Sequence, residues 1–223
     1  SQDAFSGPQS FMVSHHASVN SESNVGWGDM VDSWQMDKFV FADVRHKLHA
    51  CCHGTHAMVE ALLKLQVDHQ FKIDEIVGVQ VKTAPRWLNV CDIKAPRTGL
   101  EIKFSYIFLA AMVLRGSNLA AYETYDDAVC NDVAVQALAT KVHVIGDKAI
   151  ADSASFVQIT LNDRRKIEDS FDLLSPIDLG QLTLRLKSKA AGLIGEKKAE
   201  RIWSSIYGYD GILARDIADY LQS

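Results

Sequence analysis

The sequence predicts an α+β fold, in which helices pack on a small antiparallel sheet and a helical tail follows. Residues 74–83 and 156–161 alternate apolar and polar side chains, which is the period of a strand with one buried face. Residues 55–66 and 100–114 carry apolar side chains at helical spacing or almost continuously, as amphipathic and buried helices do. The chain of 223 residues is long enough to bury a substantial core.

The first part of the chain has the weakest pattern. Residues 1–37 are rich in Ser, Gly, Asn and His and show no sustained apolar period, which is typical of loop and short helix. We expect a short strand at 39–44. A helix should follow at 55–66, with Thr55 as its N-cap residue.

The middle of the chain should supply a strand and the central helix. A loop is expected at 85–96, and one helix should then run over 98–115 and end at Gly116. Its apolar residues lie nearly all round, which predicts a buried helix. Strand 74–83 should place three valines on one face, namely Val77, Val79 and Val81.

Helix and strand patterns then alternate again. Residues 126–141 predict a helix, and 142–145 a strand. Strand 156–161 should turn at Asn162-Asp163 into a partner strand that runs through Ile167. The inward side chains of the helix should include Val129, Val133 and Leu138.

After Pro176 the sequence predicts three successive amphipathic helices, at 179–193, 196–207 and 210–222, with Gly195 between the first two. Each has an apolar strip that another surface must cover. The tail is therefore expected to pack on a helical partner or to form a homodimer.

The composition argues against several classes of function. A net charge of −5 and the lack of a long Lys/Arg run argue against nucleic acid as a partner. The longest apolar run, 106–114, is too short to cross a bilayer, so no membrane partner is expected. Four cysteines do not make a disulfide framework for a chain of this size, which predicts reduced thiols and a cytoplasmic protein.

Residues 47–56 concentrate the side chains that can carry chemistry. The run Lys-Leu-His-Ala-Cys-Cys-His-Gly-Thr-His places a lysine, three histidines and two cysteines just before a helix. Unpaired N–H groups and a partial positive charge at a helix N-terminus favour carboxylate or phosphate. We therefore predict an anion-binding corner, in which Lys47 holds a carboxylate and His56 holds one or moves a proton.

Other interpretations of this run stay open. A zinc site would find suitable ligand atoms in Cys51, Cys52, His53 and His56. No metal is expected, however, because adjacent cysteines in an extended segment point opposite ways and no second ligand pair follows. Cys52 beside His53 and a helix start is a candidate nucleophile, although no residue clearly orients a partnering base. A solvated basic turn, with His56 paired to Glu60, fits the spacing as well as an anion site does.

Two blocks of sequence support a closer comparison. The first is Lys-Leu-His-Ala-Cys-Cys-His-Gly-Thr-His-Ala-Met at 47–58, followed by Val-Glu-Ala-Leu. The second is Lys-Phe-Ser at 103–105, preceded by Thr-Gly-Leu-Glu and followed by an apolar helix that ends at Arg115-Gly116. They resemble the lysine-to-histidine segment and the "AKFS" helix of the MmgE/PrpD family, which includes 2-methylcitrate dehydratase, cis-aconitate decarboxylase and iminodisuccinate epimerase. Weaker similarity covers residues 5–8 and 187–221.

The resemblance implies two domains, a large helical domain and an α+β lid. Residues 44–178 would form the lid, while 1–43 and 179–223 would belong with the helical domain, whose bulk lies outside this sequence. The active site of the family lies in the cleft between the domains. It acts on small di- or tricarboxylates without a metal or an organic cofactor, so no cofactor is expected here.

The resemblance also assigns residues. Lys47 matches the lid lysine that contacts substrate and His56 matches the last histidine of the motif, so both are expected to be catalytic. Cys52 stands where the decarboxylases carry a histidine, which argues against decarboxylation of cis-aconitate. Phe108 replaces a tyrosine of many members, which removes a possible proton donor. The residues expected to bind substrate are Lys47, Cys52, His53 and Lys103.

Two functions follow from these expectations. The first is the C-terminal part of a MmgE/PrpD-like lyase or isomerase that removes a proton alpha to a carboxylate. Alone it should have little or no activity, because the aspartate and histidines of the helical domain have no counterpart here. The alternative is a non-catalytic binding or dimerisation module built on the tail helices.

Overall fold

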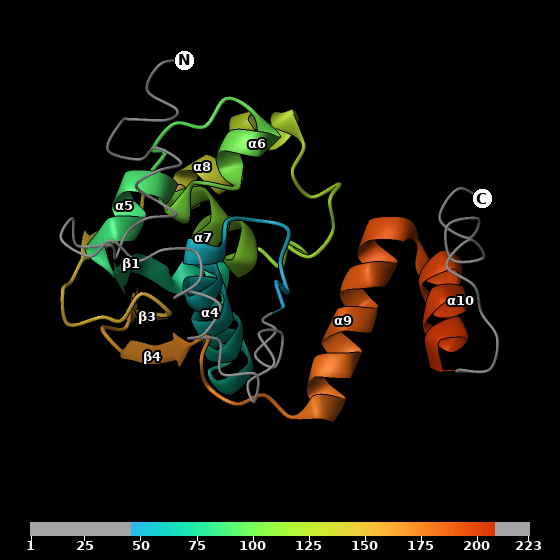
Figure 1. Cartoon of the computed structure of the whole chain (residues 1–223). Helices are drawn as coiled ribbons and strands as arrows, with labels where there is room; N and C mark the ends of the chain where they lie inside the picture. Colours follow the sequence, from blue (N-terminus) through green and yellow to red (C-terminus); the bar gives the residue numbers. More distant parts are fainter. Residues whose placement is uncertain (1–45, 208–223) are drawn as a thin grey trace, which may run out of the picture. The chain divides into compact units, whose positions relative to one another are not determined.

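A computed structural model describes residues 46–207, which belong to one compact unit that begins at His46. Three predictions lie outside these residues: the lead-in segment 1–43, the strand at 39–44 and the third tail helix at 210–222. The described chain contains four strands and a series of helices, which confirms the predicted α+β class (Figure 1).

The sheet has the strand order β2-β1-β3-β4. Its strands are β1 (Ile76–Thr83), β2 (Val142–Gly146), β3 (Ala154–Leu161) and β4 (Lys166–Asp172). The β1–β3 and β3–β4 pairs are antiparallel, as predicted, whereas β2 runs parallel to β1. The sheet is therefore mixed, because the helices between β1 and β2 carry the chain back to the end where it started.

Strand β1 contains an irregularity that reverses one predicted orientation. The pairing register with β3 shifts between Ile76 and Gly78. Ile76 and Val79 are consequently both buried, while Val77 is 58% exposed. The predicted face of three valines is thus wrong at Val77, because one extra residue in a strand turns its neighbours to the opposite face.

Helix α4 (His56–Asp68) lies on β3 and β4 and packs against α7 (Tyr106–Leu114), which is buried along almost its whole length (Figure 1). The predicted central helix is in fact broken into α6 (Gly99–Ile102) and α7. The break occurs because the Ser105 hydroxyl accepts a hydrogen bond from the Phe108 N–H as the N-cap of α7, a role that helix interiors do not allow. The predicted stop at Gly116 is confirmed by its φ of 81°.

Two other segments differ from their predictions. The expected loop at 85–96 begins with α5 (Pro85–Cys91), which Pro85 starts at the first helical position. The expected helix at 126–141 is split by Asp132 into a 3-10 helix, Asp127–Asn131, and α8 (Val133–Ala139). Because Asp132 caps α8, Val133 lies in its first turn and is 78% exposed rather than inward.

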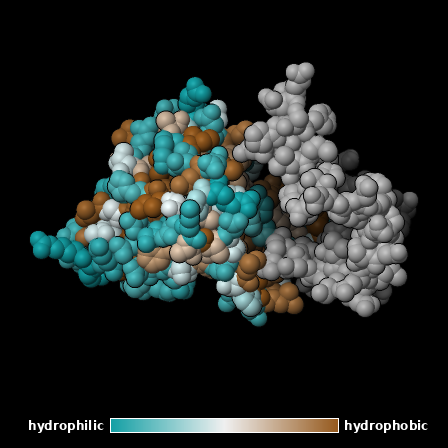
Figure 2. All heavy atoms as spheres, turned by 60° about the vertical axis from the view of Figure 1, so that its left-hand side comes forward, coloured by the Kyte–Doolittle hydropathy of each residue, from teal (hydrophilic) through white to brown (hydrophobic). Residues whose placement is uncertain are grey.

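The tail forms two helices, α9 (Leu179–Ile194) and α10 (Glu196–Tyr207), which pack on each other across Gly195. No residue of α9 is fully buried. Elsewhere exposed apolar side chains are interspersed with hydrophilic ones on the face shown in Figure 2, as on ordinary protein surfaces. Within residues 46–207, no helix combines the length and the apolar character that crossing a membrane requires.

A 3-10 turn, His53–Thr55, leads into α4 and packs directly on α5. At Gly54 an added Cβ would lie 2.3 Å from Cε3 of Trp87, which is too close for any side chain. The missing side chain of Gly54 therefore sets how closely the candidate functional segment approaches α5.

We predict that Gly54→Ala lowers the free energy of unfolding by about 1–3 kcal/mol, because the Trp87 ring must move to admit a methyl group. Gly78→Ala is the matched control, since the nearest atom to its added Cβ is 4.0 Å away. Urea unfolding of both variants measures the difference. Equal stability of the two variants would contradict the proposed packing.

Candidate functional site

The segment from Lys47 to Cys52 is fixed by backbone hydrogen bonds to distant parts of the fold. The Ala50 N–H donates to the Leu119 carbonyl at 2.8 Å, and the Cys52 N–H donates to the Lys103 carbonyl at 3.0 Å. The two predicted blocks, 47–58 and 103–105, are therefore adjacent in space. The backbone of the candidate site is part of the folded core rather than a free loop.

Thr55 does not cap α4 in the predicted manner. Its hydroxyl donates to the carbonyl of Cys52 at 2.8 Å, and its side chain makes no cap hydrogen bond to the helix. The Thr55 N–H also bonds the Cys52 carbonyl, at 3.1 Å. The N-terminus of α4 thus continues from the 3-10 turn, which satisfies N–H groups that an isolated helix would offer to an anion.

Three histidines form a row beside this turn. The ring centroid of His56 lies 5.2 Å from that of His49 and 5.4 Å from that of His53. His56 is buried, whereas His53 is exposed. Burial first, and then the neighbouring histidines and Lys47, lower the pKa of His56 to about 3. His56 is therefore a neutral imidazole at physiological pH, with Nε2 placed 3.4 Å from the Cys51 carbonyl.

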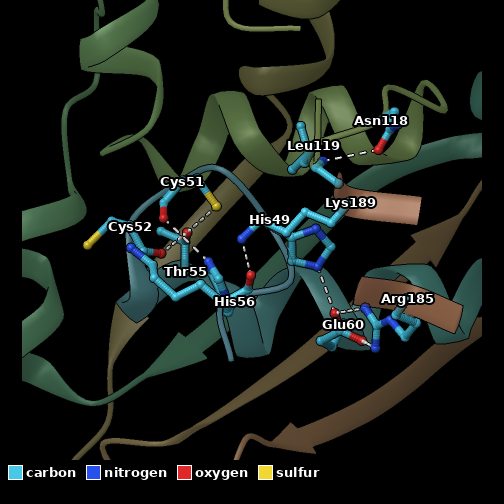
Figure 3. A network of polar contacts seen from close by, with 12 residues as sticks. His49, Cys51, Cys52, Thr55, His56, Glu60, Asn118, Leu119, Arg185 and Lys189 are labelled. Carbon is cyan, nitrogen blue, oxygen red and sulfur yellow. Dashed lines mark hydrogen bonds and ion pairs between the residues drawn. The ribbon is translucent and has the colours of Figure 1, made fainter. Parts of the chain in front are cut away.

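Glu60 is the buried acid of the site, and it pairs with residues other than His56. Its Oε1 lies 2.7 Å from His49 Nε2 and also accepts from Arg185 Nη2, while its Oε2 accepts from Arg185 Nη1 at 2.8 Å (Figure 3). Burial raises the pKa of Glu60, but the hydrogen bonds and charges of His49 and Arg185 outweigh burial and lower it to about 2. The alternative of a His56–Glu60 pair is therefore wrong.

The positive charges of the site are gathered at Lys47. Lys47 is exposed, and its carbonyl accepts a hydrogen bond from the ammonium of Lys189 on α9. Partial desolvation and the charge of Lys47 both lower the pKa of Lys189 and of His53. Within residues 46–207, neither lysine forms a salt bridge. Among the described residues, the corner therefore holds more positive than negative charge.

The cysteines point in opposite directions, as predicted (Figure 3). Cys51 Sγ lies 3.3 Å from the hydroxyl of Thr55, and burial raises the pKa of the Cys51 thiol. Burial, and then the neighbouring Cys52, raise the pKa of the Cys91 thiol. In the described part of the chain, no group of three or more His, Cys, Asp or Glu residues is arranged to hold a metal ion.

Lys103 is joined to the site by its backbone, while its charge lies elsewhere. Its Nζ is 4.4 Å from the ring centroid of Tyr122 and 4.8 Å from that of Tyr125. Such cation–π contacts hold an ammonium group against aromatic faces. The structure thus brings together Lys47, Cys52, His53 and His56, and directs the ammonium group of Lys103 to the two tyrosines. Phe108 is buried in α7.

A comparison with known protein families matches residues 49–172 to the MmgE/PrpD C-terminal domain. The matched region contains α4, the whole sheet and the helices between them. The chain therefore belongs to the MmgE/PrpD family. A search among curated proteins found no match.

Four residues of the site were not identified from the sequence as site residues: His49, Glu60, Arg185 and Lys189. Arg185 and Lys189 are four residues apart, so they lie on one face of α9, and this basic pair is a signal that the sequence does contain. The sequence could not identify Glu60 as the partner of Arg185, because the two residues are 125 positions apart in the chain.

The pKa of His56 makes stability depend on pH. The unfolded chain binds a proton at this residue below about pH 6.5, whereas the folded chain does not until about pH 3. Stability should therefore fall as the pH drops through this window, and His56→Gln should reduce the slope by up to about 1.4 kcal/mol per pH unit. Urea unfolding at several pH values measures this slope. His69→Gln, at an exposed position just after α4, is the control, and an unchanged slope in His56→Gln would refute the assignment.

Proposed function

We propose that this chain is the C-terminal part of a lyase or isomerase that removes a proton alpha to a carboxylate of a small di- or tricarboxylate. Family membership supports this proposal, and the observation that carries it is the excess of positive charge at Lys47. An ammonium group with no carboxylate partner in the described residues is suited to bind the carboxylate of a ligand.

Lys47 is the proposed substrate-binding and catalytic cation. When the Cα–H bond of the substrate breaks, its electron pair moves into the adjacent carboxylate as an enolate, and a nearby ammonium stabilises this added charge. In an elimination, the bond from the neighbouring carbon to its hydroxyl group then breaks. The leaving hydroxyl group takes a proton from an acid of the complete active site and departs as water. Epimerisation instead returns a proton to the opposite face.

The histidines divide into an outer and an inner group in this proposal. His53 is exposed, and its lowered pKa favours the neutral imidazole that a general base requires. His56 lies directly behind it as a buried, neutral ring, so it assists by holding His53 in place or by passing a proton. The catalytic role of His56 and the substrate-binding roles of Cys52 and His53 stay predictions.

The remaining acid–base groups are proposed to come from a helical domain. Glu60 cannot serve as the base, because both its oxygens are occupied by His49 and Arg185. We further propose that the lid is formed by 44–178 and that the tail packs on the helical domain or on a second copy. Leu179 and Leu184 of α9 are 75% and 68% exposed in this chain. Such exposed apolar side chains support the proposal that another surface covers the tail.

We expect citrate to bind the full chain and to shift the amide NMR signals of residues 46–56. Lys47→Met should weaken citrate binding about tenfold, which corresponds to the loss of one charge-assisted hydrogen bond. Lys148→Met, at an exposed position after β2, removes the same charge elsewhere and should change binding little. Equal binding by both variants would refute the role of Lys47.

The chain by itself should not turn over 2-methylcitrate or iminodisuccinate, because it supplies only part of the acid–base set. Dehydration and epimerisation assays on the purified chain measure this. Robust turnover would overturn the proposed division of the active site. Absence of any citrate binding would favour the non-catalytic module instead, and the mass in solution would then show whether α9 and α10 join two copies.

A further inference from the structure

We propose that Lys189 on α9 is a second substrate-binding residue, which acts with Lys47 to favour ligands with two or more carboxylates over monocarboxylates. We also propose that the Glu60 clamp, which is the set His49, Glu60 and Arg185, positions Lys189 for this role. The inference rests on the proposed function and adds a specificity-determining residue to it.

Lys189 forms no salt bridge with another described residue. Its ammonium donates to the carbonyl of Lys47 and is half-buried, and within 46–207 it has no carboxylate partner. Burial and the charge of Lys47 both disfavour its charged form. A ligand carboxylate between the two lysines would relieve both effects, because it replaces lost hydration and offsets the repulsion.

The clamp brings the two lysines together through its own partners. Lys47 lies two residues before His49, and Lys189 lies one helical turn after Arg185. His49 and Arg185 bind the same carboxylate, so Glu60 holds the segment of Lys47 beside α9, where the Lys189 ammonium donates to the Lys47 carbonyl. A planar guanidinium that uses two N–H groups fixes the position of α9 more firmly than a single contact can.

Two ammonium groups on separate elements select ligands by the number of carboxylates that each ligand carries. A monocarboxylate can satisfy one of them and leaves the other unpaired, whereas a di- or tricarboxylate can satisfy both at once. The second contact is then made within one complex, so it adds affinity without a second cost of association. The preference for several carboxylates should consequently depend on Lys189 as much as on Lys47.

The test measures binding of citrate, succinate and acetate to the full chain by titration calorimetry at fixed ionic strength. Lys189→Met should weaken citrate and succinate binding about tenfold and acetate binding less than twofold. The control Lys197→Met removes a charge at an exposed position of α10 and should leave all three affinities within twofold of the wild type. Equal weakening of all three ligands by Lys189→Met would overturn the inference.

The role of the clamp is tested by a double-mutant cycle. Arg185→Lys keeps the charge but loses the two-pronged contact, so it should weaken succinate binding severalfold, and adding Lys189→Met should cause little further loss. Additive losses would contradict a positioning role.

If Lys47→Met weakens citrate binding and Lys189→Met does not, the inference fails while the proposed function stands. If citrate does not bind the wild-type chain, both fail.

Discussion

The arrangement of the candidate site depends on the buried carboxylate of Glu60. A carboxylate removed from water is costly unless charged or polar partners hydrogen-bond it, and Glu60 has His49 on one side and Arg185 on the other (Figure 3). These partners come from the segment before α4 and from α9, which are far apart in the chain. Loss of either would leave a buried charge incompletely paired, so the carboxylate fixes the relative positions of three segments.

The chemistry of the site follows from this constraint. His49 and Arg185 bind the carboxylate of Glu60. Within residues 46–207, Lys47 and Lys189 therefore form no salt bridge. Burial and the charge of Lys47 lower the pKa of His53 and of His56, which favours the neutral imidazole of each. Among the described residues, the corner therefore combines a surplus of ammonium groups with neutral imidazoles, which is the combination that the proposed binding of a polycarboxylate and removal of its proton require.

Local periodicity predicted the α+β class, α4, the β3–β4 hairpin and the stop at Gly116, because each depends on neighbouring residues. It failed where one polar side chain interrupts an apolar run, as at Ser105 and Asp132, and where a bulge turns Val77 outward. The run 47–56 was recognisable for the same local reason. The partners of Glu60 were not, because helical spacing favours His56 whereas the folded chain brings in Arg185 from 125 residues away.

The most direct test of this account is amine cross-linking of the full chain with a short reagent, followed by mass spectrometry of the peptides. If the Glu60 clamp holds α9 beside the segment before α4, Lys47 and Lys189 should cross-link in the native chain. The same cross-link should be strongly reduced in Arg185→Met and retained in Lys197→Met. A wild-type chain without this cross-link, or an Arg185→Met chain that forms it to the same extent, would contradict the account.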